Sequence, residues 1–186
     1  NWQIDSSEVN RVLAYWRAGA YHVDPDGADG YAPGTGTTAA ALLTADQASL
    51  TATQSAAGFT PGATLTIRSS IDLPEGASLL SLLWTPNLPS DWTIDSASGD
   101  GAPEVSPSGT EILFTGSNLT SLPIEFSYQV TVPEDYCDSI DLTAAIEYQI
   151  DGMANTASYQ AQPDPLSLSP IDSKNPVLED RTVTGT

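Results

Sequence analysis

Three carboxylates lie within six residues of one another in a glycine-rich stretch near the start of the chain, in the pattern Asp24-x-Asp26-x-x-Asp29-Gly30. Ca²⁺ takes about six to eight oxygen ligands, and closely spaced acids beside a glycine supply several of them from one loop. Aspartates next to proline and glycine also cap tight turns without any metal. The pattern therefore leaves two interpretations open: a Ca²⁺ loop on Asp24, Asp26 and Asp29, or an Asp-capped turn.

The residues that nucleophilic catalysis requires are few and far apart. His22 is the only histidine and lies in the same glycine- and aspartate-rich stretch, and Cys137 is the only cysteine. A lone cysteine excludes an intrachain disulfide. The chain also has no Gly-x-Ser-x-Gly motif, the setting of an activated serine in many hydrolases. We therefore predict that the protein is not an enzyme, that His22 packs or hydrogen-bonds within its loop, and that Cys137 is a core residue.

A second set of oxygen ligands occupies the first eight residues. Residues 1–8 (NWQIDSSE) resemble the second half of an EF-hand calcium loop. In such a loop, side-chain oxygens alternate with a backbone carbonyl, and a bidentate glutamate closes the site. On that resemblance, Asn1, Asp5 and Glu8 supply side-chain oxygens and Gln3 supplies a backbone carbonyl. The resemblance implies that Ca²⁺ is a cofactor of the N-terminal segment.

The residues that follow extend this resemblance. With residues 7–19 (SEVNRVLAYWRAG), the half loop looks like a dockerin-type repeat of bacterial extracellular proteins, over about 20 residues. Dockerins are small Ca²⁺-dependent modules that dock onto cohesin sandwiches. This sequence departs from the pattern at Trp2, which stands where the loop usually has glycine. A plain amphipathic helix packed on the edge of a sandwich explains the same residues.

Residues 4–19 carry the helical pattern of the chain. Their apolar residues recur at the spacing i, i+3, i+4 and i+7, which places them on one stripe of a helix: Val9, Val12, Leu13 and Trp16. Asp5 or Ser6 is a suitable N-cap, and Gly19 is a suitable stop. Residues 20–36 are rich in Gly, Asp and Pro, which predicts a structured loop or linker.

Beyond this loop, the hydrophobic period changes from 3.6 to 2. Residues 65–71, 124–132 and 142–150 alternate apolar and polar side chains, as strands with one buried face do. Asp151-Gly152 is a hairpin signal, and further turn signals recur between the runs. The spacing predicts an antiparallel sandwich of roughly seven to nine strands. Its core is expected to contain Ile67, Phe114, Phe126, Tyr128, Val130, Ile146 and Tyr148.

These patterns divide the chain into three parts. Residues 1–36 form the dockerin-like helix and acidic loop, residues 37–162 the β-sandwich, and residues 163–186 a Pro-rich tail. The predicted fold class is mainly β: an antiparallel immunoglobulin-like sandwich with one short N-terminal α-helix. The alternating segment Val177–Thr184 is too short to fold alone, so it is expected to pair with an edge of this sandwich or of another molecule.

The body of the chain carries a resemblance of its own. Residues 59–62 (FTPG), 88–92 (LPSDW) and 126–133 (FSYQVTVP) look like parts of immunoglobulin-like or cohesin-like repeats of large bacterial surface proteins. The resemblance covers roughly residues 45–162 and is one of fold. It implies a secreted protein, extracellular or at the cell surface.

The charge of the chain excludes several partners. Five Lys and Arg against 24 Asp and Glu give a net charge of −19. Such a surface repels nucleic-acid phosphates and anionic lipid headgroups. No apolar run approaches the ~20 residues that span a bilayer. We therefore expect no nucleic-acid partner and no membrane span.

Three functions agree with these observations. The preferred one is a structural subunit of an extracellular filament or surface assembly, joined by strand and helix contacts between copies or with another extracellular protein. The second is a calcium-dependent docking or adhesion module. The third is a carbohydrate-binding module, in which Trp84 and Trp92 form a sugar-stacking platform instead of lying in the core.

Overall fold

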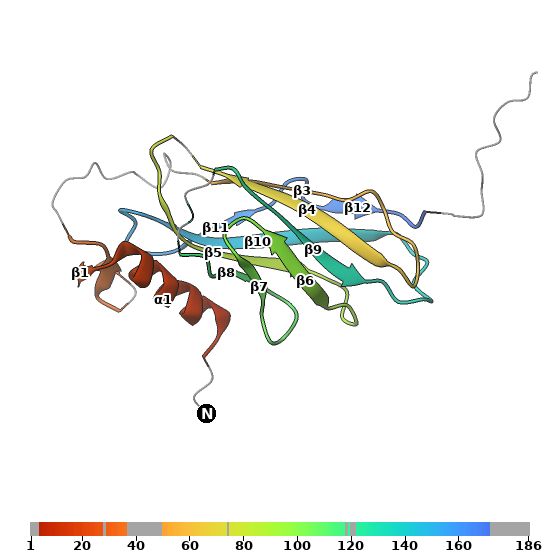
Figure 1. Ribbon diagram of the computed structural model, residues 1–186, viewed down its shortest axis with the longest axis horizontal. Helices are drawn as coiled ribbons and strands as arrows, with labels where there is room; N and C mark the ends of the chain where they lie inside the picture. Colours follow the sequence, from red (N-terminus) through yellow and green to blue (C-terminus); the bar gives the residue numbers. More distant parts are fainter. Residues whose placement is uncertain are drawn as a thin grey trace, which may run out of the picture.

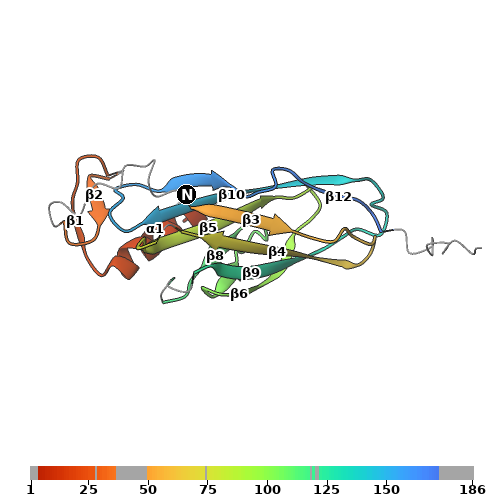
Figure 2. The same cartoon turned by 90° about the horizontal axis from the view of Figure 1, so that it is seen from above.

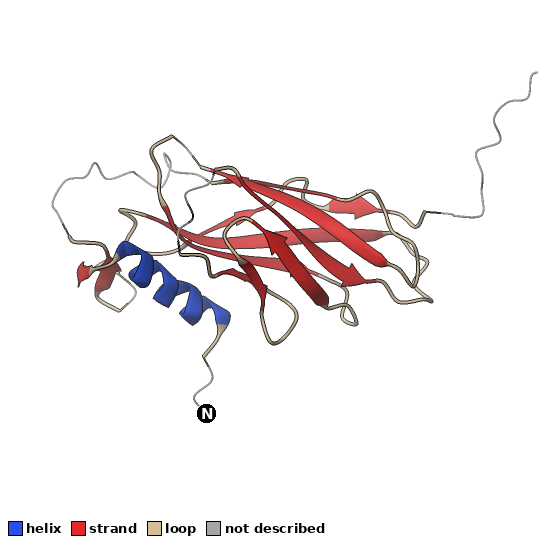
Figure 3. Cartoon of the chain, in the orientation of Figure 1, coloured by secondary structure: helices blue, strands red, loops and turns tan. Residues whose placement is uncertain are grey.

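The alternating runs of the sequence become strands in the computed structural model, which describes residues 4–27, 29–36, 50–73, 75–117, 119 and 122–171. Across these ranges the fold is mainly β, with one helix and antiparallel pairing between neighbouring strands (Figure 1 and Figure 3). The predicted fold class is therefore confirmed. The elements are α1 (Ser6–Ala18), β1 (Tyr21–Val23), β2 (Tyr31–Pro33), β3 (Thr51–Ser55), β4 (Thr64–Asp72), β5 (Leu79–Asn87), β6 (Ile94–Gly99), β7 (Pro103–Val105), β8 (Ile112–Phe114), β9 (Ile124–Thr131), β10 (Ile140–Ile150), β11 (Ala157–Gln160) and β12 (Leu166–Leu168).

Two sheets make up the sandwich. One has the strand order β11-β10-β5-β8-β7, with β12 also paired to β10, and the other has the order β3-β4-β9-β6. The described residues thus contain ten sandwich strands, more than the seven to nine expected. Strands β1 and β2 form a separate hairpin beside α1 at one end of the molecule (Figure 2). The stretch predicted as a linker or structured loop therefore contains two strands, Tyr21–Val23 and Tyr31–Pro33, that pair as a hairpin.

The inner faces of the two sheets form one hydrophobic core. The residues expected there are all buried, which confirms the predicted strand register: Ile67, Phe114, Phe126, Tyr128, Val130, Ile146 and Tyr148. At its centre the Phe126 ring meets Trp84 and Phe114 edge to face, with centroids 5.1 and 4.9 Å apart. Such aromatic pairs contribute about 0.5–1.5 kcal/mol beyond the burial of their area.

Both tryptophans considered for a sugar platform belong to this core. Trp84 has no exposed surface, and Trp92 lies edge-on to Phe59 and Tyr136 at centroid distances of 6.1 and 5.2 Å. The interpretation of both rings as core residues is confirmed, and the alternative of a sugar-stacking platform on them is wrong, because a buried ring cannot stack on a sugar. Sequence alone did not decide this, since a strand tryptophan has the same pattern on either face.

Two local predictions need correction. Cys137 is exposed, so its assignment to the core is wrong; it lies in the connection between β9 and β10, outside any alternating strand. The hairpin signalled by Asp151-Gly152 does form, but β11 begins only at Ala157, so the connection runs over residues 151–156.

Strand β5 is buried on both faces because α1 covers its outer side. Trp84 points into the main core, while its neighbour Leu83 pairs with Leu113 on the opposite face and is also buried. Helix α1 packs mainly against β5. No helix in the described part of the chain has the length and apolar character that a bilayer crossing requires.

The boundaries of α1 are set by local side-chain chemistry. Asp5 is the N-cap: its Oδ1 accepts the Glu8 amide at 2.9 Å, and the Asp5 amide donates to Glu8 Oε2 at 3.1 Å, which completes a capping box. Gly19 ends the helix in the left-handed conformation with φ 68°, where glycine has no Cβ to clash. The predicted helix and its caps are confirmed.

Candidate functional site

Helix α1 is fixed to the sandwich by an arginine. The Arg17 guanidinium donates from Nη1 to the Leu80 carbonyl at 2.6 Å, and from Nε and Nη2 to the Gly116 carbonyl at 3.1 Å each. Nη2 also donates to the Phe114 carbonyl. Burial lowers the pKa of Arg17 to about 10, because a desolvated guanidinium is less easily kept charged. One side chain thus ties the helix to β5, to β8 and to the loop after β8.

The remainder of the docked face is polar or small. Asn10 is fully buried, and its Nδ2 donates to the Glu147 carbonyl of β10 at 3.5 Å. Ser7 Oγ donates to Glu147 Oε2 at 3.3 Å. Ala14, also fully buried, allows close approach to the sheet. Asn10, Ala14 and Arg17 recur at i, i+4 and i+7, so they form one side of the helix.

This docking leaves the apolar stripe of the helix in water. Trp16 is 57% exposed and Val12 is 65% exposed, with Val9 and Ile4 exposed as well. The stripe lies roughly 120° around the helix from the docked side, at 100° per residue. Leu13, between the two sides, is half-buried. The interpretation in which this stripe packs on the sandwich is therefore wrong for Val12 and Trp16.

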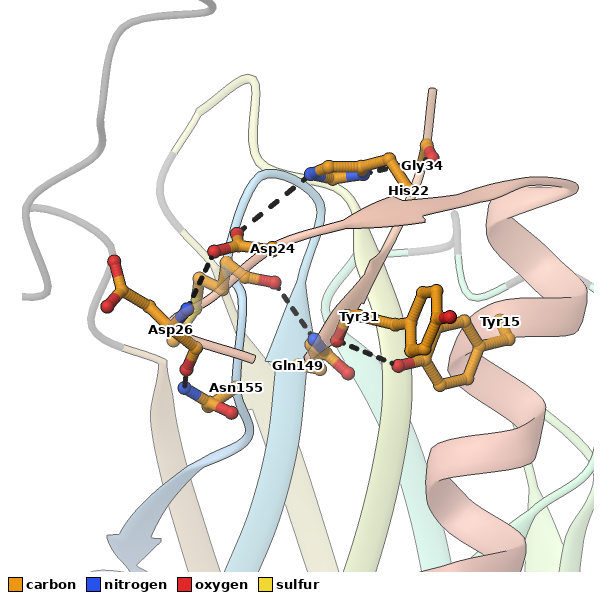
Figure 4. A network of polar contacts seen from close by, with 9 residues as sticks. Tyr15, His22, Asp24, Asp26, Tyr31, Gly34, Gln149 and Asn155 are labelled. Atoms are coloured by element: carbon orange, nitrogen blue, oxygen red, sulfur yellow. Dashed lines mark hydrogen bonds and ion pairs between the residues drawn. The ribbon is translucent and has the colours of Figure 1, made fainter. Parts of the chain in front are cut away.

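The first hairpin adds further exposed apolar side chains beside the helix. Tyr21 lies edge-on to both Tyr15 of α1 and Tyr31 of β2, at centroid distances of 6.3 and 5.8 Å. The Tyr15 hydroxyl donates to the Tyr31 carbonyl at 3.0 Å (Figure 4). We call the exposed large apolar residues of α1, its approach and the hairpin the apolar surface: Ile4, Val9, Val12, Trp16, Tyr21, Val23 and Tyr31.

The apolar surface holds most of the exposed large hydrophobic residues of the described chain. Outside it, only Leu122 and Ile171 belong to that class. Single exposed hydrophobic residues are ordinary, whereas their concentration on one part of a soluble protein marks an interaction site.

The three acids of the Asp24–Gly30 stretch form the turn of the hairpin. Asp24 Oδ1 accepts the Asp26 amide at 3.0 Å, the geometry of an Asp-capped turn. Its other oxygen lies 3.9 Å from His22 Nε2. The Asp26 carbonyl accepts Asn155 Nδ2 at 2.7 Å, which ties the turn to the β10–β11 connection, as Figure 4 shows. Asp29 forms an ion pair with Arg11 at 2.9 Å.

These acids do not form a calcium cage in this arrangement. Their carboxylates go to different partners, and no three or more His, Cys, Asp or Glu side chains of the described residues gather closely enough to hold a metal ion. Asp5 and Glu8 of the half EF-hand loop occupy the capping box of α1. Asn1 and Gln3 lie outside the described residues. Calcium binding stays a prediction, and the capping box supplies a way to test it.

His22 hydrogen-bonds within the hairpin, as predicted. Its Nδ1 lies 3.2 Å from the Gly34 carbonyl, and its ring closes over Gly36, where an added Cβ would meet the imidazole at 2.7 Å. The histidine therefore fixes the end of the hairpin. No nucleophilic side chain among its described contacts gives it a catalytic partner.

Sequence reasoning missed Asn10 and Arg17, the two polar residues that dock the helix. Both were visible only as members of an i, i+4, i+7 series, which a search for apolar residues passes over. An arginine in the last turn of a helix is also expected for its interaction with the helix dipole, so its sequence position does not mark it as a buried clamp.

Comparison with known proteins gives structural neighbours only. Neither a protein-family model nor a curated protein sequence matches the chain. Among solved structures, the full-length major pilin SpaD from Corynebacterium diphtheriae is similar at a TM-score of 0.46 and 8% identity, over 60% of this chain and 34% of the pilin. The chain thus spans about a third of that protein's length.

Two other neighbours match along nearly their whole length. CaCohA2 from Clostridium acetobutylicum has a TM-score of 0.39 and 14% identity, over 66% of this chain and 92% of its own. The GAE domain of GGA2p from Saccharomyces cerevisiae has a TM-score of 0.39 and 10% identity, over 66% of this chain and 91% of its own. At these scores and identities the neighbours carry nothing about function.

Proposed function

We propose that this chain is a structural subunit of an extracellular or cell-surface assembly, which binds its neighbours and does no chemistry. The single observation that supports this proposal is the apolar surface on α1 and the first hairpin. The helix is held on the sandwich by Arg17 and Asn10, so its apolar stripe is left free for another molecule.

The composition of the apolar surface suits a protein interface. Trp16, Tyr21 and Tyr31 belong to the residue types that are enriched at interface centres and that carry most binding energy. Burying a large apolar side chain that was exposed contributes ~1.5–3 kcal/mol. The three rings also lie on a helix and a hairpin that are braced against the sandwich, so little conformational entropy is lost when a partner covers them.

The net charge of −19 opposes contact between copies and sets how assembly should respond to salt. Like-charged copies repel over a Debye length of about 10 Å at 0.1 M salt, and higher ionic strength shortens that range. Higher ionic strength does not weaken the apolar contacts between copies. We therefore expect assembly to increase with ionic strength.

The test compares the native chain with a double variant, Val12→Ser with Trp16→Ser, by light scattering after size exclusion and by electron microscopy at rising protein and salt concentration. Leu122→Ser, an exposed apolar residue outside the apolar surface, is the matched control. We expect assemblies in the native and control proteins and their loss in the double variant. A native chain that is monomeric under every condition contradicts the proposal.

A docking module for a different extracellular protein would use the same apolar surface. That alternative predicts a native chain that is monomeric alone, with the Val12→Ser, Trp16→Ser variant failing to bind the partner.

A further inference from the structure

The connection between β3 and β4 borders a groove. The two strands pair only as far as Ser55 opposite Arg68, and the chain reaches the start of β4 at Thr64 through a wide loop. Residues 55–60, 63–66, 68 and 171 line the groove, which has a volume of about 590 Å³. Volumes of roughly 300–1,000 Å³ are typical of sites that bind small molecules. The size of the groove therefore suits a small ligand.

Small and apolar residues make up most of the lining. Phe59 and Leu65, both buried, contribute apolar surface, and Ile171 is 51% exposed at the border. Residues 55–58 of the loop are Ser, Ala, Ala and Gly, so no long side chain from this part of the loop fills the space. A ligand that enters the groove therefore meets hydrocarbon over much of its length.

Strand β4 presents backbone hydrogen-bonding groups to the groove. The Ala63 carbonyl accepts the Val132 amide at 3.0 Å, so Ala63 bonds toward the β9 side. Because hydrogen-bonded and non-bonded positions alternate in an antiparallel pair, Thr64 and Thr66 direct their amides and carbonyls to the opposite side. Among the described residues no strand pairs with them there, since β3 ends opposite Arg68. These amides are available to a polar group of a ligand.

The charge of the groove is opposite to that of the chain as a whole. Arg68 lines it, and its described lining contains no Asp or Glu, although the chain carries 24 acids. Of the three arginines in the described residues, Arg17 is bound by carbonyls and Arg11 is paired with Asp29. Arg68 is exposed and, within the same ranges, has no carboxylate partner. The groove therefore offers a cation that no acid of the described chain neutralises.

We infer that this groove binds a small amphiphile with one apolar chain and one carboxylate head group. The chain of the ligand lies against Phe59, Leu65 and Ile171. The carboxylate accepts hydrogen bonds from the Arg68 guanidinium, whose planar donors match the two carboxylate oxygens. This site goes beyond the proposed function, which uses the apolar surface on α1 and the first hairpin.

The two ends of the groove differ in charge, which sets the direction of the ligand. Arg68 lies where β3 and β4 begin to pair. Glu134 packs against Gly62 in the turn before β4, where an added Cβ would lie 3.1 Å from its Cγ. The head group therefore lies toward Arg68 and away from Glu134. Thr64 and Arg68 are about 13 Å apart along the strand at about 3.3 Å per residue, which accommodates an acyl chain of medium length.

Titration of the full chain with decanoate tests the site, with decanamide as the uncharged probe of the same length. Calorimetry measures the two affinities, and amide NMR spectra show which residues the probes contact. We expect saturable one-to-one binding of decanoate that shifts the Thr64 and Thr66 amide signals. Decanamide should bind at least about fivefold more weakly, because it lacks the charge-assisted contact with Arg68.

Two variants separate the head-group contact from the chain contact. Arg68→Gln should remove the preference for decanoate over decanamide, whereas Arg11→Gln, the matched control on α1, should preserve it. Ile171→Ser should weaken the binding of both probes. Leu122→Ser, an exposed apolar residue that does not line the groove, should weaken neither. The amide spectra also show whether each variant is folded, and the ratio of the two affinities in the native chain decides the charge contact without any variant.

Three results would overturn the inference. The first is the absence of saturable decanoate binding up to its solubility limit, and the second is equal affinity for decanoate and decanamide. The third is a decanoate affinity that is lost in the Val12→Ser, Trp16→Ser variant, with signal shifts confined to α1 and the first hairpin, because the probe then binds the apolar surface instead. The assembly measurements on that double variant test the proposed function separately, since neither residue lines the groove.

Discussion

Replacing Arg17 with alanine should release α1 from the sandwich. The change removes the hydrogen bonds that the guanidinium makes to three carbonyls, those of Leu80, Phe114 and Gly116. A hydrogen bond contributes about 1 kcal/mol net, and about 1.5–3 kcal/mol when one partner is charged. Because Arg17 is half-buried and water can reach part of the site, the lower value applies. Three acceptors then give about 3 kcal/mol for the docking of the helix.

Hydrogen exchange followed by mass spectrometry measures the free energy that Arg17 contributes to the docking of α1. Since every 1.4 kcal/mol is a factor of ten in an equilibrium constant, 3 kcal/mol corresponds to about a hundredfold faster exchange in peptides from residues 6–18. Peptides from β9, at the centre of its sheet, should exchange as in the native protein. In the Arg17→Lys variant, exchange in residues 6–18 should be faster than in the native protein and slower than in Arg17→Ala. An ammonium group cannot donate to several carbonyls at once as a planar guanidinium does.

Arg11→Ala is the matched control for this experiment. Arg11 is also a cation of α1, but its ion pair with Asp29 lies at the surface and such pairs contribute less than about 1 kcal/mol. Exchange in α1 should therefore rise only a few-fold. If Arg17→Ala and Arg11→Ala accelerate exchange equally, or if Arg17→Ala leaves it unchanged, Arg17 is not the clamp that holds the helix.

Three further predictions concern the helix cap, the core and the contact between Gly58 and Ser169. Asp5→Ala should destabilise α1 by about 1 kcal/mol through loss of the N-cap, as measured by hydrogen exchange in excess chelator. The predicted calcium site requires a larger cost in Ca²⁺, and an equal cost in both conditions would contradict Asp5 as a calcium ligand. Phe126→Ala should lower the unfolding free energy by about 3–5 kcal/mol in urea titrations, and a loss below 1 kcal/mol would contradict its central place between Trp84 and Phe114. Gly58→Ala should lower the melting temperature, since φ is +88° and the added Cβ would lie 2.8 Å from the Ser169 carbonyl; an unchanged melting temperature would show that this contact is loose.

The sequence alone was sufficient for the features that depend on neighbouring residues. The caps of α1 follow from Asp5, Glu8 and Gly19, each of which acts on backbone groups within four residues. The alternation along β4, β9 and β10 fixed which side chains enter the core, because successive strand residues point to opposite faces. The fold class and the core residues on these strands were predicted correctly for this reason, whereas Cys137, which lies outside any strand, was not.

Only the tertiary structure decided which side of α1 faces the sandwich. The sequence left open whether the apolar stripe packs on the sandwich or contacts another molecule. The sheet presents to the other side of the helix the carbonyls of Leu80, Phe114 and Gly116, more than sixty residues away in sequence. Buried carbonyls must be hydrogen-bonded, and Arg17 satisfies them while the stripe stays in water. This orientation of the helix has no local sequence signal, since it depends on partners that the chain brings together only when it folds.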